Sequence, residues 1–352
     1  MPVSPVMLDL ALARMEGLVV HFVGNKLREE KLFISNEPVT ELDEDEEAML
    51  LKFFMKSFNT EELYRFTHPS DLSLNEIYTF ASKLFADPDT FAKQSKNMAN
   101  HLYACSTHPK VKGGELYVAY FSHCVIDGEE VDAIGLFKTE SKEKYLDATM
   151  KKEAYRLNFH EGVPLGKVEK GGLILNKGAE EGFTVCVVDS KNGEALYWTN
   201  DFLNVTPQSN SFHQTKTYLK ICQEFATNQL PEVAEVTKAD QIDLMNRSVE
   251  YFKSNKELNS ENFAEEIFEE PEVRDSFRNF KKDFEQQHDI EVEDGFEIST
   301  KAVKKQAQVF KSVLKLDKNF HIYIHGDKRL IEKGFDEETG KHYYKIFYDQ
   351  EF

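Results

Sequence analysis

The residues in this sequence that are most able to do chemistry are two histidines and a glycine-containing segment. His321 and His325 lie four positions apart, a spacing at which two histidines of a helix can share one zinc ion. The alternating residues around them favour a strand, where positions four apart are separated by roughly 13 Å, too far for one metal. The segment 162–167 has three residues between its glycines instead of four, and Val168 stands where a phosphate loop needs Ser or Thr. We therefore expect no metal site and no cofactor.

Nucleophilic catalysis also lacks its sequence patterns. No G-x-S-x-G elbow occurs, no cysteine lies in a protease signature, and the pair His160-Glu161 has no second histidine at zincin spacing. The four cysteines are scattered without a C-x-x-C pair, which favours thiols packed as small apolar side chains. The chain is therefore predicted not to be an enzyme and to have no catalytic residues. A metal-dependent nuclease or another phosphate-handling hydrolase, built on the abundant carboxylates, remains the alternative.

Charge is distributed unevenly along the chain. The 352 residues include 43 Lys and Arg against 62 Asp and Glu, so the formal net charge is −19. Nucleic acid and anionic membranes repel such a chain on average. Residues 257–297 contain 15 acidic and four basic residues, whereas residues 299–348 contain 11 basic and six acidic ones. Any direct contact with DNA must therefore come from the C-terminal segment.

The basic residues of this segment are interleaved with aromatic ones, a pattern that suits a surface tracking a phosphate backbone. Lys301, Lys304 and Lys305 fall at helical neighbour positions and are expected to form one cationic face. The candidates for DNA binding are Lys301, Lys304, Lys305, Lys311, Lys315, Lys318, Lys328, Arg329 and Lys333. The alternative is that these residues dock on the acidic segment 257–297 and neutralise it within the fold, and the count of charges alone favours this alternative.

The elements that would position these residues predict an α+β fold. In the first part of the chain, strands follow each other without intervening helices, which indicates a mainly antiparallel sheet and not a doubly wound nucleotide-binding fold. The turn Asp127-Gly128 between two alternating segments predicts a hairpin. Ser73, with Glu76 three positions on, is predicted to cap a helix over 74–85. Further strands are predicted over 154–159, 172–175, 184–189 and 195–198.

The short polar segment 205–210 is the best domain boundary, since it contains a proline and separates two kinds of pattern. It divides the chain into an α+β domain over 1–205 and a second domain over 211–352. The second domain is predicted to be a helical region, with helices over 211–228, 238–254, 260–268 and 271–287. A basic C-terminal β-meander follows, with strands over 309–316, 320–325, 330–335 and 342–348.

No apolar run in the sequence is long enough to span a membrane, and the first residues lack the pattern of a secretory signal. We therefore expect a cytoplasmic protein that makes no membrane contact.

Several strings of this sequence are similar to the 37-kDa nucleoid-associated proteins of bacteria, particularly the version found in Bacteroidetes-like bacteria. They follow one another along nearly the whole chain and include HFVGNKL at 21–27, LFKTESKEKYL at 136–146, EALYWTNDFLNV at 194–205, HQTKTYLKICQEF at 213–225, DQIDLMNRSVEYFK at 240–253 and the long string at 302–334. The resemblance implies a cytoplasmic protein that is recovered with the bacterial nucleoid and is generally described as DNA-binding. It supplies no catalytic residues.

The residues and the resemblance together predict a nucleoid-associated, non-catalytic binding protein. Its predicted partner is DNA, contacted through the C-terminal basic face or through a chromosome-bound protein, for which chromosome-maintenance proteins are candidates. A protein-binding scaffold that uses its acidic helices as the docking surface is a third hypothesis. The oligomeric state is not predicted.

Overall fold

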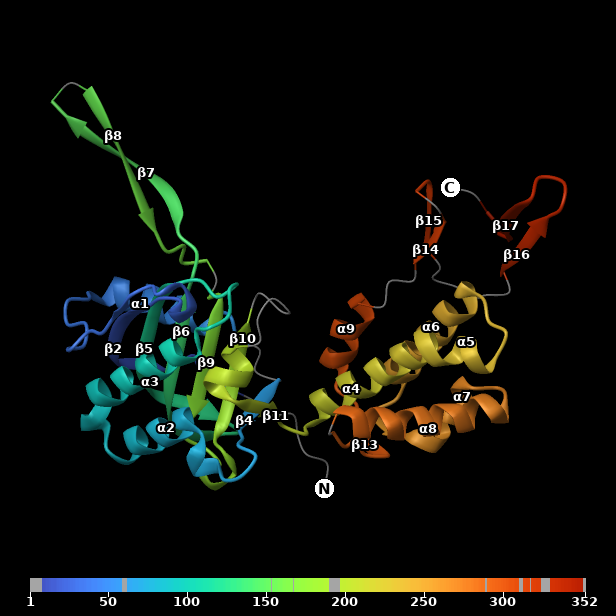
Figure 1. The fold of residues 1–352 in the computed structure, drawn as a ribbon, viewed down its shortest axis with the longest axis horizontal. Helices are drawn as coiled ribbons and strands as arrows, with labels where there is room; N and C mark the ends of the chain where they lie inside the picture. Colours follow the sequence, from blue (N-terminus) through green and yellow to red (C-terminus); the bar gives the residue numbers. More distant parts are fainter. Residues whose placement is uncertain are drawn as a thin grey trace. The chain divides into compact units, whose positions relative to one another are not determined.

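The computed structural model of this chain divides into two compact units, Pro5–Gln208 and Ser209–Phe352. The structure describes residues 8–58, 62–152, 154–166, 168–189, 197–288, 290–309, 313–316, 318–323 and 330–350. An antiparallel sheet with helices fills the first unit, and helices followed by short strands fill the second (Figure 1). The predicted α+β fold is confirmed. Within the described residues, no helix is long and apolar enough to cross a bilayer.

The first unit is built on one large sheet, which has nine strands in the described part of the chain. The strand order is β11-β4-β10-β9-β6-β5-β2-β3, with β1 beside β5, and the pairs between these strands are antiparallel. The strands are β1 (Leu8–Asp9), β2 (Arg14–Val23), β3 (Leu32–Phe33), β4 (Leu63–Phe66), β5 (Gly114–Ile126), β6 (Glu129–Thr139), β9 (Lys170–Leu175), β10 (Thr184–Asp189) and β11 (Val205–Pro207).

Helices cover both faces of this sheet, because its central strands carry apolar side chains at successive positions. Along β6, Leu136 points to one face and Phe137 to the other. The face of Leu136 packs against α2 (Glu76–Ala86) and α3 (Phe91–Cys105), while the face of Phe137 packs against α1 (Glu44–Met55). The sheet is therefore the buried middle layer of the unit.

The predicted hairpin at Asp127-Gly128 is confirmed. This turn joins β5 to β6, and both of its residues have positive φ, 54° for Asp127 and 79° for Gly128. A two-residue hairpin turn of this kind requires positive φ at both central positions, which Asp and Gly tolerate best.

The predicted cap of α2 is wrong. Ser73 lies in a short 3-10 turn, and Asn75 caps the helix by accepting a hydrogen bond from the backbone N–H of Tyr78 at 2.9 Å. The amide of Asn75 also donates to the backbone oxygens of Thr67 and Leu203, at 3.1 and 3.0 Å. A serine hydroxyl has one proton to donate and cannot satisfy both oxygens, so Asn is the better cap here.

The strand predicted over 195–198 is wrong at 197 and 198, the two of these positions that the structure describes. Tyr197 and Trp198 begin a π-helix, Tyr197–Leu203. The Trp198 side chain is buried, donates from Nε1 to the backbone oxygen of Gly171 at 3.2 Å and packs against Phe202. Trp198 is the single tryptophan of the chain, so its fluorescence reports on the first unit alone.

Between β6 and β9 the chain leaves the sheet as a long hairpin of β7 (Glu143–Lys151) and β8 (Ala154–Gly162), and Figure 1 shows it projecting away from the sheet. The strand predicted over 154–159 is part of β8, but β7 was not predicted. All nine residues of β7 are exposed. The alternation of apolar and polar residues over 146–151 is the sequence signal that could have predicted this strand.

The second unit is helical around an aromatic core. Its helices are α4 (Ser211–Glu224), α5 (Leu230–Val233), α6 (Lys238–Ser254), α7 (Ser260–Ile267), α8 (Pro271–His288) and α9 (Thr300–Val309). Rings buried between them include Tyr218, Phe225, Phe252, Phe263 and Phe277. A short antiparallel pair, β12 (Glu257–Asn259) and β13 (Gly295–Glu297), connects the beginning of α7 to the segment before α9.

The C-terminal strands form hairpins. β14 (Val313–Leu316) pairs with β15 (Phe320–Tyr323), and β16 (Ile331–Asp336) pairs with β17 (Lys341–Ile346). In the described residues these are two separate two-stranded sheets, and not the single meander that was expected. The strand expected from residue 309 begins at 313, because α9 continues to Val309. Apolar side chains of both hairpins pack with residues of α6.

Candidate nucleic-acid interface

The first three candidate lysines for DNA contact lie on α9. The side chains of Lys301, Lys304 and Lys305 are exposed, whereas Ala302 and Val303 between them are buried against the rest of the unit. At 3.6 residues per turn, positions 301, 304 and 305 fall on one side of the helix. The three ammonium groups therefore share one exposed face, which we call the α9 face.

Of the other six candidates, the three that the structure describes lie in the C-terminal hairpins. Lys318 is exposed in the turn between β14 and β15, and Lys333 is exposed on β16. Lys315 belongs to β14, but its side chain is not among those described. Three candidates lie outside the described residues: Lys311, Lys328 and Arg329. The structure thus brings three candidates together on α9, whereas the other candidates that it describes lie on the two C-terminal hairpins.

The basic segment packs on helices that precede the acidic segment in the sequence. α9 packs chiefly against α4 and α6, and the core contacts of the two C-terminal hairpins are also with α6. Within the acidic segment, Arg278 pairs with Glu261 and Asp275, so part of its charge is neutralised locally. Lys305 also has a contact within the fold, since its ammonium group lies 5.7 Å from the centre of the Phe212 ring of α4.

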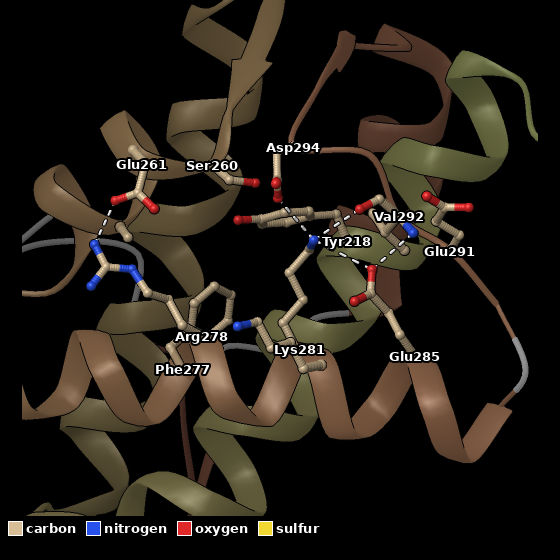
Figure 2. Close-up of a pocket in the computed structure, with 12 residues that line it drawn as sticks. Tyr218, Ser260, Glu261, Phe277, Arg278, Lys281, Glu285, Glu291, Val292 and Asp294 are labelled. Atoms are coloured by element: carbon tan, nitrogen blue, oxygen red, sulfur yellow. Dashed lines mark hydrogen bonds and ion pairs between the residues drawn. The ribbon is translucent and has the colours of Figure 1, made fainter.

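A cavity of about 370 Å³ lies in the second unit beside α8 (Figure 2). Lys281 points into it and donates to the backbone oxygen of Val292 at 2.8 Å and to Asp294 at 3.1 Å, with Glu285 at 3.3 Å. Burial raises the pKa of the neighbouring Tyr218 hydroxyl well above its usual value. Because the Lys281 ammonium is already held by two carboxylates and a carbonyl, this cluster ties α8 to the segment that follows it.

No group of three or more His, Cys, Asp or Glu side chains in the described residues is arranged to hold a metal ion. The cysteines are free thiols, and Cys124, Cys186 and Cys222 are buried in hydrophobic cores. Burial raises the pKa of the Cys124 and Cys186 thiols to about 12, so both are protonated at neutral pH. Since the thiolate is the reactive form, these two cysteines lack the property of a nucleophile.

Sequence reasoning missed a buried ionic cluster in the first unit. The side chain of Lys138 is 0% exposed, and its Nζ donates to the backbone oxygen of Lys112 at 2.6 Å and to Glu140 and the Tyr197 hydroxyl at 3.1 Å each. The Tyr197 hydroxyl donates in turn to Glu140 at 2.9 Å. Burial lowers the pKa of Lys138, and the Glu140 carboxylate opposes that shift.

A second ion pair extends this cluster. Lys170 contacts Asp189 at 2.9 Å, and both side chains are nearly buried. The ammonium groups of Lys138 and Lys170 lie 5.4 and 5.1 Å from the centre of the Tyr197 ring, within the range of a cation–π interaction. The aromatic ring therefore lies close to two buried positive charges.

The cluster holds the root of the β7–β8 hairpin. The Glu169 carboxylate accepts hydrogen bonds from the backbone N–H groups of Glu140 and Ser141, and from the Ser141 hydroxyl at 2.7 Å. Glu140 and Ser141 lead into the hairpin, and Glu169 follows it, so both ends are joined. A lysine at the end of a continuously buried strand, Lys138 in β6, is the sequence signal that could have revealed the cluster.

A family model described as nucleoid-associated protein YejK matches residues 19–351, nearly the whole chain. The match includes both units, the β7–β8 hairpin and α9. No curated protein matches the chain.

Proposed function

We propose that this chain, which belongs to the family of the nucleoid-associated protein YejK, is a non-catalytic protein of the cytoplasmic bacterial nucleoid that contacts DNA directly through the α9 face. Family membership supports the association with the nucleoid. The observation that carries the direct contact is the exposure of Lys301, Lys304 and Lys305 on one side of α9, with Ala302 and Val303 buried on the other.

A local contact of this kind agrees with the charge of the whole chain. The net charge of −19 repels DNA at long range, but salt screens this repulsion beyond roughly 10 Å at 0.1 M. Along the helix axis, Lys301 to Lys305 spans about 6 Å, so the three ammonium groups can reach neighbouring phosphates. Contacts to phosphates carry no sequence information, so binding to the duplex should be insensitive to base sequence.

Replacing Lys301, Lys304 and Lys305 together by Glu is expected to weaken duplex binding by roughly a hundredfold or more, because three phosphate contacts are lost and three repulsive charges are added. Fluorescence anisotropy of a labelled duplex at about 50 mM salt measures this change, since low salt strengthens phosphate contacts. The matched control replaces Lys83, Lys93 and Lys110, three exposed lysines of the first unit, by Glu and alters the net charge equally.

Equal loss of affinity in both triple variants would contradict a local contact at α9. If the unaltered protein fails to bind the duplex, the direct route is excluded and a chromosome-bound protein partner becomes the route to the nucleoid. A pull-down from lysate with and without nuclease treatment then separates a protein partner from DNA. Incubation of the duplex with Mg²⁺ or Mn²⁺ tests the hydrolase alternative, which requires cleavage in at least one of them.

A further inference from the structure

The β7–β8 hairpin, residues 143–162, has one apolar and one polar face. Residues that are paired across its two strands share a face, and side chains alternate between faces along each strand. One face carries six apolar side chains, in the pairs Leu146–Phe159, Ala148–Leu157 and Met150–Tyr155. The opposite face is polar over the same length, with the pairs Asp147–Asn158 and Thr149–Arg156. We call the first of these the apolar face.

The apolar face lies in water in the isolated chain. Its five large side chains are exposed by 54% at Leu146 to 75% at Phe159, and Ala148 is exposed as well. Together they leave on the order of 600 Å² uncovered, at the top of the range for the largest apolar patch of a monomeric protein. A two-stranded hairpin alone is at best marginally stable in water and needs a covered apolar face. A contact that the isolated chain does not make must therefore cover the apolar face of this hairpin.

We propose that the apolar face packs against the same face of a second copy of this chain, so that the two hairpins form a two-layered interface. Two such faces stacked on each other would bury about 1,200 Å² in total, the lower end of the range for specific interfaces. An interface in which each copy presents the same surface is the usual arrangement of a protein dimer.

The charge of the hairpin suits a second copy of this chain. Residues 143–162 contain four acidic and four basic residues, in a chain whose net charge is −19. The hairpin is thus locally neutral, and two acidic chains can meet there without the repulsion expected elsewhere on their surfaces. A neutral face offers no attraction for the phosphates of nucleic acid.

The apolar face is also complementary to itself. Lys144 and Glu161 lie opposite each other at the end of the face nearest the sheet. If a two-fold axis runs along the strands, β7 of one copy lies over β8 of the other. Lys144 of each copy then faces Glu161 of the other copy, and the small Ala148 faces the larger Leu157. Opposite charges therefore face each other across the interface, and a small side chain faces a large one.

The root of the hairpin supports this role. Glu169 joins the segments that enter and leave the hairpin, and Lys142 pairs with Glu115 of β5 at 2.6 Å. These contacts attach the hairpin to the sheet at its base, so its apolar face is presented by an ordered element and not by a free loop. The residues of this interface are separate from those of the proposed DNA contact, so each contact can be removed without altering the other.

The test measures the mass of the full-length chain by sedimentation equilibrium. The protein concentration is well above the dissociation constant, which is expected to be micromolar for an interface of this size. The unaltered chain is expected at twice its mass of 40.7 kDa. The double variant Leu157→Thr, Phe159→Thr keeps strand-favouring residues but removes the apolar surface, and is expected to sediment as a monomer. The control variant Asn158→Thr, His160→Thr alters the polar face of the same strand and is expected to remain a dimer.

A monomeric unaltered chain would overturn the proposal, and so would a dimer that survives in Leu157→Thr, Phe159→Thr. Loss of the dimer in both double variants would overturn the assignment to the apolar face. Unchanged Trp198 fluorescence shows that each variant keeps the fold of the first unit.

Cross-linking gives a second and independent measurement. With a short bis-maleimide, Ala148→Cys on the apolar face is expected to yield a covalent dimer. Thr149→Cys on the polar face is expected to stay at the level of the unaltered chain, in which Cys105 is the partly exposed cysteine. Equal cross-linking at both positions would contradict the face-to-face arrangement.

Discussion

Replacement of Lys138 by Met is expected to destabilise the first unit by about 3–5 kcal/mol, the usual cost of removing one partner of a buried ion pair. The Glu140 carboxylate is 3% exposed and would lose its ammonium partner without gaining water. The Tyr197 hydroxyl and the backbone oxygen of Lys112 would lose a donor at the same time. Urea unfolding followed by Trp198 fluorescence measures the loss as a lower midpoint.

Lys142→Met is the matched control for this prediction. Lys142 also pairs with a glutamate, Glu115, at 2.6 Å, but the two side chains are 44% and 22% exposed. Exposed pairs of this kind contribute about 0–1 kcal/mol, because water solvates both partners when the pair is broken. If Lys138→Met costs no more stability than Lys142→Met, the buried cluster contributes no more to the first unit than an exposed ion pair does.

The stability of the first unit is expected to fall as the pH drops from about 6.5 to 4, because His21 is buried in its neutral form. The side chain is 2% exposed in β2, and its Nδ1 accepts a hydrogen bond from the backbone N–H of Ser35 at 3.1 Å. Burial, together with the positive charge of Lys96, lowers the pKa of His21 to about 4.

The direction of this change in stability with pH follows from the lowered pKa of His21. Above the unfolded pKa of about 6.5 the histidine is neutral in both states, and its contribution is fully present. Below that value the unfolded chain binds a proton at His21 and the folded chain does not. The stability therefore declines until the pH has fallen below the pKa of His21 in the folded chain. The total loss is about 3 kcal/mol, of which about 2 kcal/mol has been lost at pH 5.

Urea midpoints from Trp198 fluorescence between pH 7.5 and pH 4 measure the decline. His21→Asn keeps an acceptor near the Ser35 N–H but removes the titrating ring, so this variant is expected to lose the His21 part of the decline. His123→Asn is the control, since His123 is an exposed partner of Glu130. A pH profile unchanged by His21→Asn would show that another group causes the decline.

The regular elements could be predicted where the sequence pattern reflects burial within the chain itself. Residues 238–254 were predicted as a helix and form α6 with the same bounds, because their apolar residues recur at helical spacing around Phe252 and its neighbours. The Asp127-Gly128 hairpin was predictable for a local reason, the positive φ that these residues tolerate. Each of these two signals comes from residues that are close together in the sequence.

The features that were missed depend on contacts between distant residues. Lys138 is balanced by groups from Lys112 to Tyr197, and no spacing along the sequence predicts that these meet. β7 is the exception, because the alternation of apolar and polar residues over 146–151 is a local signal that could have predicted it. For the candidate DNA contact, spacing predicted the helical side shared by the three lysines of α9. The placement of Lys315, Lys318 and Lys333 on separate hairpins emerged only from the fold.

The salt dependence of duplex binding tests the proposed contact at α9 most directly. Each phosphate neutralised by a lysine adds about 0.9 to the slope of log Kobs against log salt concentration, so replacing Lys301, Lys304 and Lys305 by Gln is expected to reduce the slope by about 2.7. Gln substitutions at Lys83, Lys93 and Lys110 are expected to leave the slope unchanged. A slope that is the same in the α9 variant and in the unaltered chain would contradict a direct contact through this face.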